Sequence, residues 1–369
     1  MPRVLDTFLE AVRIDSPSGE EAAFGAWCAE RLRAVGCSVR FDETGPACGS
    51  DCGNLIAELA GSGPGTVIVL SAHLDTVNPG RGIEPIVEDG VVRSAGDTVL
   101  GADDKAGIAA ILEALERVQE GGLVTAPVRV LLTTGEELGL QGAKALDPAD
   151  CTGDLCLVLD AHEPVGGIVS AAPTQYTFRA EFVGTAAHAG VEPEKGVSAL
   201  RMAAWAVSTM PFGRLDERTT ANVGEIHGGG PTNVVTASTF IRGECRSTDP
   251  ERAHEVRAQM DDAMRAAAAE SGGTVAIEWT LEYAGFRFDA EDPAMRMLKS
   301  ACADIGVTPN IFDTGGGSDA NILTANGLPS VVLSCGMTDV HSTSESIAVA
   351  DLTSLSDLLV AVLIRAATA

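Results

Sequence analysis

The sequence has 369 residues, of which 45% are hydrophobic, and a formal net charge of −27 at pH 7. We expect about two domains, because single hydrophobic cores stop growing near roughly 250–300 residues. The acidic balance argues against nucleic acid and anionic membranes as partners, since both call for basic patches. No apolar run reaches the ~20 residues of a membrane helix, and the start MPRVLDTFLEAV has the pattern of an amphipathic helix instead of a secretion signal. We therefore expect a cytoplasmic protein.

Nine cysteines are spread along the chain. In a cytoplasmic protein we expect them to be reduced. Cys48 and Cys52 have the spacing of half a metal site, but no second pair with ligand spacing follows. We therefore do not expect these cysteines to hold a metal.

Four apolar runs predict strands that are buried on both faces. The runs TVIVLSAHLD, VRVLLTTGEE, DLCLVLDAHE and LPSVVLSCGM begin at residues 66, 128, 154 and 328. Helical patterns such as Lys105–Glu120 separate them. Strands that alternate with helices are typical of a parallel sheet. The expected fold is α/β, with a mostly parallel sheet sandwiched by helices.

The middle of the chain has a different pattern. The segments YTFRAEFVG, STFIRGECRS and TVAIEWTLEY alternate apolar and polar residues, as strands with one buried face do, and Pro250–Ala269 reads as a helix. Because strands of the first type resume afterwards, we predict a smaller α+β domain over residues 172–283. This domain is inserted into a larger one formed by residues 1–171 and 284–369.

Acids and histidines follow the ends of the apolar runs. In open α/β sheets the ligand crevice lies beyond the carboxyl ends of the strands. Any one such residue is most often only the polar end of a strand, but six of them at four strand ends predict a functional site. The six are His73, Asp75, Glu136, Glu137, Asp160 and His341.

Two motifs near the start of the predicted sheet suggest metal chemistry. His73 and Asp75 in AHLDTV are two residues apart, so in extended backbone the Asp75 carboxylate can hold one ring nitrogen of His73 while the other binds a metal. GADDKAG, residues 101–107, opens a helix with two aspartates. These either cap the helix or include a carboxylate that bridges two cations about 3.5–4 Å apart.

The adjacent acids Glu136 and Glu137 suggest two different roles. Neighbours in extended backbone project to opposite sides, so one glutamate can bind a metal while the other serves as general base. The alternative is a solvated acidic turn before the next helix. Two tetrahedral zinc ions that share one carboxylate and one water need five protein ligands, and cobalt or manganese would suit the same ligands less tightly. The chain supplies five in His73, Asp103, Glu137, Asp160 and His341.

Taken together, HLDTV, GADDKAG, GEELG and the late His341 resemble the M20 family of di-zinc peptidases and deacylases. The chain is most similar to the tripeptidase T branch of that family, also through PTQYTF, EPEKGVSAL, GRLDERTTANVG and PTNVV. This resemblance implies that His73, Asp103 and Asp160 bind one zinc ion. It implies that Asp103, as the bridge, binds the second ion together with Glu137 and His341.

The resemblance also assigns the supporting roles. It implies that Asp75 orients His73, that Glu136 activates a bridging metal-bound water as general base, and that the peptide bond between Asp103 and Asp104 is cis. In the inserted domain it implies substrate contacts from His188, Asn233 and Arg246, and a homodimer through that domain as a candidate assembly. We interpret GGGSDAN, residues 315–321, as a backbone wall of the cleft, since it lacks the ending of a phosphate loop.

The expected activity is zinc-dependent removal of the N-terminal residue from short peptides, as in tripeptidases. The alternative within the same chemistry is a deacylase or dipeptidase that acts on N-acyl amino acids or other small amides, which the same ligands would serve. A catalytically silent metal or peptide binder is the alternative from another class. The glutamate beside Glu137 disfavours the silent binder, because such a protein has no need of a base.

Overall fold

The computed structural model describes residues 1–368, which form two compact units. The smaller unit comprises Ala171–Arg287 and Asp313–Gly317, and the larger one contains the segments before, between and after these. The sequence placed Asp313–Gly317 in the larger domain. The structure groups it with the smaller unit, where Thr314 N donates a hydrogen bond to Ala171 O at 2.9 Å.

A mixed sheet forms the centre of the larger unit. Its four central strands, in the order β6-β3-β7-β16, are parallel, and β2 and β8 flank them in antiparallel pairing. The predicted α/β class with a mainly parallel sheet is confirmed. The strands, in chain order, are β1 (Ser38–Phe41), β2 (Leu55–Leu59), β3 (Ile68–His73), β6 (Val128–Thr133), β7 (Leu155–Ala161), β8 (Gly167–Ala172), β15 (Asn310–Asp313), which pairs with β8, and β16 (Ser330–Ser334).

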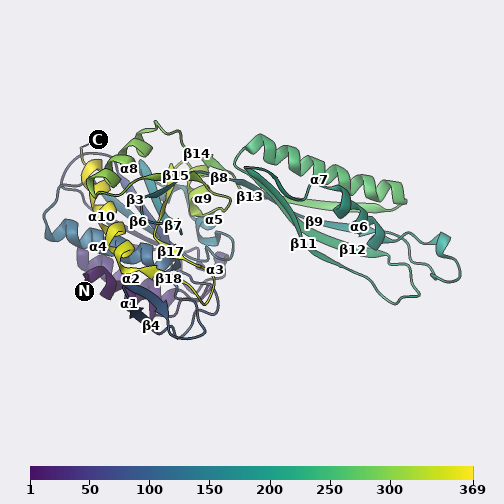
Figure 1. Ribbon diagram of the computed structural model, residues 1–369, viewed down its shortest axis with the longest axis horizontal. Coiled ribbons are helices and arrows are strands. Elements are labelled where there is room, and N and C mark those ends of the chain that lie inside the picture. The colour runs from purple at the N-terminus through teal and green to yellow at the C-terminus, as the bar shows by residue number, and fades with distance from the viewer. Residues whose placement is uncertain (369) are drawn as a thin grey trace. The chain divides into compact units, whose positions relative to one another are not determined.

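Helices cover the sheet of the larger unit on both faces. On one face, α4 packs against β3 and β7, and α1, α2 and α10 pack against α4 in turn (Figure 1). On the other face, α9 contacts β7 and β16. The helices of this unit are α1 (Arg3–Val12), α2 (Ala22–Val35), α3 (Gly45–Cys48), α4 (Ala102–Glu120), α5 (Gln141–Ala145), η1 (Pro148–Asp150), α8 (Pro293–Asp304), α9 (Asp319–Ala325) and α10 (Val349–Ala366).

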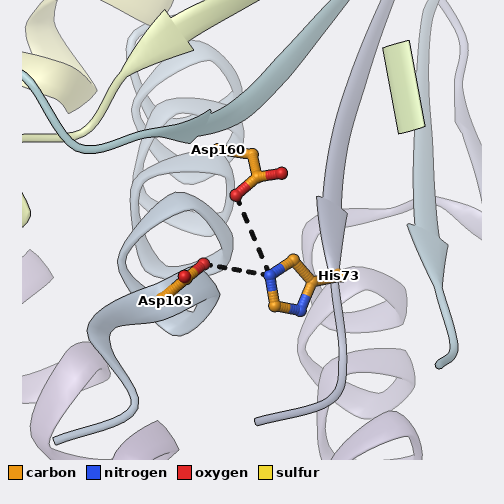
Figure 2. A group of neighbouring side chains, drawn as sticks. All are labelled: His73, Asp103 and Asp160. Atoms are coloured by element: carbon orange, nitrogen blue, oxygen red, sulfur yellow. Dashed lines mark hydrogen bonds and ion pairs between the residues drawn. The ribbon is translucent and has the colours of Figure 1, made fainter. Parts of the chain in front are cut away.

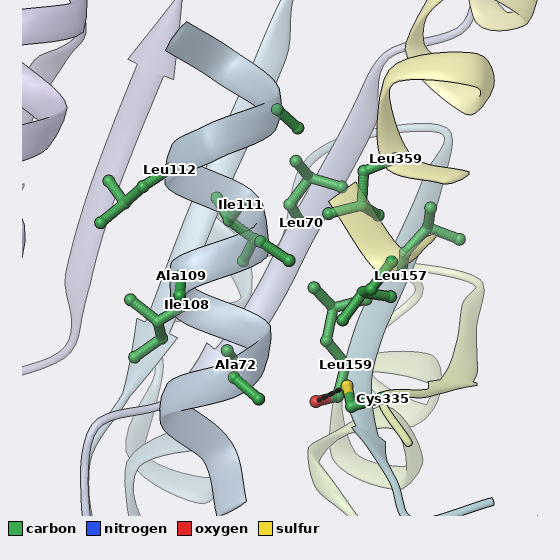
Figure 3. Close-up of a cluster of buried hydrophobic side chains, with 14 of the residues drawn as sticks. Leu70, Ala72, Ile108, Ala109, Ile111, Leu112, Leu157, Leu159, Cys335 and Leu359 are labelled. Carbon is green, nitrogen blue, oxygen red and sulfur yellow. Dashed lines mark hydrogen bonds between the residues drawn. The ribbon is translucent and has the colours of Figure 1, made fainter. Parts of the chain in front are cut away.

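The main hydrophobic core lies around α4. Ile108 and Ile111 of this helix are buried together with Leu70 of β3, Leu157 of β7 and Leu359 of α10 (Figure 3). Each such side chain stabilises the fold by roughly 1.5–3 kcal/mol through burial. The core therefore fixes α4, whose first turn carries Asp103, against the two strands whose ends carry His73 and Asp160.

A second, smaller sheet of the larger unit joins distant segments of the chain. It has the order β17-β18-β5-β4 and is antiparallel throughout. The loop that carries His341 lies between β17 and β18, so this sheet brings the last part of the chain next to the segment that precedes α4. Its strands are β4 (Pro85–Glu88), β5 (Val91–Ser94), β17 (Met337–Thr338) and β18 (Ser346–Ala348).

The smaller unit is an antiparallel sheet with two long helices on one face. Helices α6 (Ala199–Thr209) and α7 (Pro250–Ser271) bury its apolar side, as the alternating strand patterns predicted. The sheet has the order β10-β11-β12-β9-β13. Its strands are β9 (Thr174–Val183), β10 (Gly213–Asp216), β11 (Thr219–Gly228), β12 (Ser238–Ser247) and β13 (Thr274–Tyr283); β14 (Phe286–Arg287) pairs with the end of β8, and η2 spans Pro193–Lys195.

Among residues 1–368, no helix has both the length and the apolar character that a membrane crossing requires.

At Gly107, α4 approaches the sheet closely. A Cβ atom there would lie 2.8 Å from Leu159 Cβ and 2.9 Å from Leu159 O. We expect Gly107→Ala to lower the free energy of unfolding by about 1–3 kcal/mol, because overpacking must push the first turn of α4 away from β7. Denaturant unfolding would measure this, with Gly96→Ala as the control, since a Cβ at Gly96 meets no atom within 4 Å. Equal stabilities for the two variants would contradict the tight contact.

Candidate metal centre

Five elements of the larger unit bring the predicted ligands together. Strand ends of a parallel sheet meet at one edge, and α4 begins at the same edge, so side chains far apart in sequence converge there. His73 is the last residue of β3, Asp103 lies in the first turn of α4, Glu136 and Glu137 follow β6, Asp160 lies near the end of β7, and His341 lies in the loop after β17.

The Asp103 carboxylate lies between the two histidines. One of its oxygens, Oδ1, is 3.0 Å from His73 Nε2, and the other, Oδ2, is 3.2 Å from His341 Nε2. Asp160 Oδ1 lies 3.9 Å from the same His73 nitrogen (Figure 2). A carboxylate that presents one oxygen to each of two imidazoles has the geometry of a bridging ligand.

Two triads of potential ligand atoms share Asp103. His73, Asp103 and Asp160 offer atoms that all lie within 4.8 Å of one another, and so do Asp103, Glu137 and His341. In the second triad, His341 Nε2 is 2.8 Å from Glu137 Oε1. These are the two ligand groups that the sequence resemblance implied. The peptide bond between Asp103 and Asp104 is cis, which confirms that expectation.

Glu136 and Glu137 do not lie in extended backbone, as the sequence argument had assumed. Gly139 N and Leu140 N donate to Glu136 O at 2.9 and 2.7 Å, so the two glutamates begin a tight turn. Their side chains nevertheless differ. Glu137 contacts His341, whereas the Glu136 side chain makes no hydrogen bond or ion pair within residues 1–368. Glu136 also offers an oxygen within 4.8 Å of ligand atoms of His73 and Glu137.

Asp75 supports both His73 and the glutamate turn. Its backbone oxygen is 2.9 Å from His73 Nδ1, and its carboxylate oxygen Oδ1 is 3.4 Å from the same nitrogen. The carboxylate accepts hydrogen bonds from Glu136 N at 2.9 Å, Glu137 N at 3.2 Å and the Ser18 hydroxyl at 2.7 Å. The orientation of His73 therefore comes mainly from the backbone of Asp75, while its carboxylate fixes the turn with the two glutamates.

Three further carboxylates support the site, and sequence reasoning missed their roles. Asp104 accepts from His73 N at 3.2 Å, Glu21 accepts from Gly135 N at 3.1 Å, and Glu345 accepts from Asp103 N at 3.0 Å. All three are buried. Their partners are backbone amides, which leave no signal in residue type. Only the second acid of GADDKAG was visible as part of a motif.

The crowding of acids changes their proton affinities. Burial raises the pKa of Asp160 well above its usual range, and the charge of Asp103 raises it further. Burial, and then the charge of Asp160, likewise raise the pKa of Glu136. Hydrogen bonds to Asp103 and Glu137 raise the pKa of His341 to about 10. Burial lowers the pKa of His73, but the carboxylates of Asp103 and Asp75 outweigh this and hold it well above its ordinary value.

Asp319 adds a fourth supporting carboxylate at the start of α9. Its side chain is buried and accepts a hydrogen bond from the Thr133 hydroxyl at 2.5 Å. Burial raises the pKa of Asp319 to about 6. The charge of Asp319 in turn raises the pKa values of Glu136 and Asp160, so it belongs to the electrostatic environment of the site. It stands in GGGSDAN, which the sequence had suggested only as a backbone wall.

The predicted substrate residues all belong to the smaller unit. His188 and Asn233 are exposed, and Ala189 N donates to Asn233 O at 2.9 Å. The Arg246 guanidinium pairs with both carboxylate oxygens of Glu244, at 3.0 and 2.9 Å. The roles of His188, Asn233 and Arg246 toward a substrate stay predictions.

The chain belongs to peptidase family M20/M25/M40, whose model matches residues 69–365. It is 41% identical over 365 residues to the uncharacterized protein YqjE of Bacillus subtilis, and the match covers 99% of this chain and 98% of that protein. Two solved structures are similar over nearly the whole chain. The aminopeptidase PepT of Bacillus cereus has a TM-score of 0.95 at 40% identity, covering 99% of this chain and 98% of that one. A tripeptidase of Staphylococcus aureus has a TM-score of 0.96 at 36% identity, covering 100% and 98%. The resemblance to M20 peptidases seen in the sequence is confirmed.

The raised pKa values predict how the metal-free protein responds to pH. An acid whose pKa is raised on folding stabilises the folded state below its unfolded pKa, and this contribution is lost as the pH rises through the folded pKa. Asp160, Glu136 and Asp319 all shift in this sense. We therefore expect the Tm of chelator-treated protein to fall by about 5 °C or more between pH 5 and pH 8.

Differential scanning calorimetry at a series of pH values would measure this fall. His341, with its pKa raised to about 10, adds to the loss of stability above pH 6.5. In Asp319→Asn, which keeps the size of the side chain without the charge, the part of the fall that Asp319 causes as the pH rises to about 6 should disappear. A Tm of the metal-free protein that is constant or rises between pH 5 and pH 8 would contradict the description of the site.

Proposed function

We propose that this protein is a dinuclear metalloaminopeptidase that removes the N-terminal residue from short peptides, with free tripeptides as the principal substrates. The observation that carries the proposal is the position of Asp103, whose two carboxylate oxygens each lie within 3.2 Å of a different histidine. The similarity to an aminopeptidase from Bacillus cereus and a tripeptidase from Staphylococcus aureus supports the same conclusion.

The donor set fits two divalent cations. The carboxylates of Asp103, Glu136, Glu137 and Asp160 outnumber the two histidines, and they are largely shielded from solvent. Such an excess of negative charge is unfavourable in a buried site unless cations compensate it. Mixed imidazole and carboxylate ligation suits zinc, with cobalt and manganese as alternatives. His73 and Asp160 would hold one ion, Glu137 and His341 the other, and Asp103 both.

The residues of the chain divide the chemistry among them. Bound zinc ions would lower the pKa of water and polarise the scissile carbonyl. Glu136 acts as general base, because its carboxylate has no hydrogen-bond or ion-pair partner within residues 1–368 and burial raises its pKa well above the usual range, which favours accepting a proton. The proton that Glu136 accepts from water passes to the amine of the leaving group. Asp75 holds the backbone of Glu136 in place during this exchange, through the hydrogen bond from Glu136 N.

The smaller unit would supply the substrate contacts. We assign His188 to the oxyanion, and Asn233 and Arg246 to the polar or carboxylate end of the peptide. An Arg246 that exchanges Glu244 for a substrate carboxylate would keep the bidentate geometry that it already has. A homodimer through the smaller unit remains the proposed assembly.

The assignment of Glu136 as base, and of Glu137 as ligand, can be separated by mutation. We expect Glu136→Gln to lower kcat by about 10²–10⁴-fold, because the amide cannot accept a proton, while the metal content stays at two ions per chain. Glu137→Gln serves as the matched variant, and it should lose one ion. Elemental analysis together with steady-state kinetics would measure both. A Glu136→Gln variant that keeps full activity, or that loses an ion, would contradict the assignment.

The substrate class is tested by a panel of free tripeptides, dipeptides, N-blocked tripeptides and N-acetyl amino acids, with products identified by mass. We expect loss of the N-terminal residue from free tripeptides and little cleavage of N-blocked ones. Cleavage confined to dipeptides or to N-acyl amino acids would contradict the tripeptidase assignment. It would instead identify the protein as a dipeptidase or a deacylase that uses the same metal centre.

A further inference from the structure

Glu345 is a buried acid that binds the backbone just before the proposed bridging ligand. It is 2% exposed. Its Oε2 accepts hydrogen bonds from Leu100 N at 2.7 Å and Gly101 N at 2.8 Å, and its Oε1 accepts one from Asp103 N at 3.0 Å. Within residues 1–368, no Lys, Arg or His nitrogen lies within 4 Å of this carboxylate. Three converging amides therefore compensate its charge.

The turn that Glu345 binds has an unusual backbone. Gly101 has a φ of +69°, and Asp103 has φ −81° and ψ 104°, outside the helical range, although α4 begins at Ala102. This conformation points the amides of Leu100, Gly101 and Asp103 toward one point. Amides arranged in this way form a site for an anion, and the Glu345 carboxylate occupies it.

Glu345 and His341 lie on the same short loop, and both contact Asp103. His341 contacts the Asp103 side chain at 3.2 Å, and Glu345 accepts from the Asp103 backbone at 3.0 Å. The His341 side chain is half exposed, and its φ of +62° lies in a region that few residues other than glycine adopt. The position of His341 relative to Asp103 therefore depends on how this loop is anchored.

The two ligands that would hold only the first ion, His73 and Asp160, are anchored differently. His73 and Asp160 lie on β3 and β7, central strands that are hydrogen-bonded on both sides and covered by the core. We propose that Glu345 is a positioning residue that sets the spacing of Asp103 and His341, and thereby the affinity for the ion shared by Asp103, Glu137 and His341. This inference rests on the proposed dinuclear site. It predicts that the ion held by His73, Asp103 and Asp160 depends on Glu345 much less.

The test measures the two zinc dissociation constants of the full-length protein by competition with a chelator. We expect Glu345→Gln to weaken binding of the second ion, the one shared by Asp103, Glu137 and His341, by about 10–100-fold. Loss of a group that orients metal ligands commonly has an effect of this size. The amide can still accept from Leu100 N and Gly101 N, but it places an NH₂ group against Asp103 N. The constant for the first ion should change by less than about threefold.

Glu113→Gln is the matched control. Glu113 is also a glutamate with little exposure, on α4 itself, but its partner is Arg3, at 2.8 Å. We expect both zinc constants of this variant to equal those of the wild type. A Glu345→Gln protein in which both constants weaken equally, or neither weakens, would overturn the proposal. A wild-type protein that binds fewer than two ions would instead contradict the proposed function.

Two measurements keep the test decisive if Glu345→Gln does not fold. The side chain in Glu345→Asp retains the charge but is one methylene shorter, so this variant should also bind the second ion more weakly while its constant for the first ion stays unchanged. In the wild-type, metal-free protein, the amides of Leu100, Gly101 and Asp103 should exchange slowly with deuterium. Fast exchange of all three would show that Glu345 does not hold this turn, and would overturn the proposal.

Discussion

The repulsion among carboxylates at one edge of the sheet is the constraint on which the rest of the structure depends. Asp103, Glu136, Glu137 and Asp160 converge on two histidines, and burial raises the pKa of Asp160 and Glu136. A fold that gathers like charges in this way must hold them rigidly, because relaxation would separate them. It also creates a site whose natural occupants are cations.

Two kinds of support meet this constraint. The parallel strands and α4 supply a rigid base, because one hydrophobic core includes residues of the strands, such as Leu70, and of the covering helices, such as Leu359. Around the ligands, buried carboxylates bind backbone amides of the turns that carry them: Asp75 binds the glutamate turn, Glu21 the residue before it, and Glu345 the turn before α4. These three carboxylates thus hold the backbone of the turns, and the side chains of the proposed ligands remain directed toward one another.

Much of the fold was visible in the sequence because its signals are local. Continuous apolar runs such as VRVLLTT predicted the buried parallel strands, and alternation in STFIRGECRS predicted the antiparallel sheet. The grouping of Asp313–Gly317 with the smaller unit was not predictable. It depends on contacts between residues distant in sequence, such as the backbone hydrogen bond of Thr314 with Ala171 and the ion pair of Arg287 with Asp313.

The candidate ligands were also found from the sequence, because metal-ligand residue types at strand ends form recognisable motifs. The structure brings together all seven predicted residues of the larger unit. The extended backbone predicted for Glu136 and Glu137 was wrong. Short-range hydrogen bonds from Gly139 N and Leu140 N to Glu136 O fold this segment into a turn instead. The supporting roles of Glu21 and Glu345 were missed because an acid that binds amides 114 or 242 residues away resembles any surface acid.

The most direct test of the dinuclear site is a crystal structure of the zinc-loaded protein with anomalous diffraction measured at the zinc edge. Two anomalous peaks are expected, one beside His73 and Asp160 and the other beside Glu137 and His341, with Asp103 adjacent to both. A single peak, or a peak coordinated by Glu136 in place of Asp103, would contradict the two-ion site and the role of Glu136 as base.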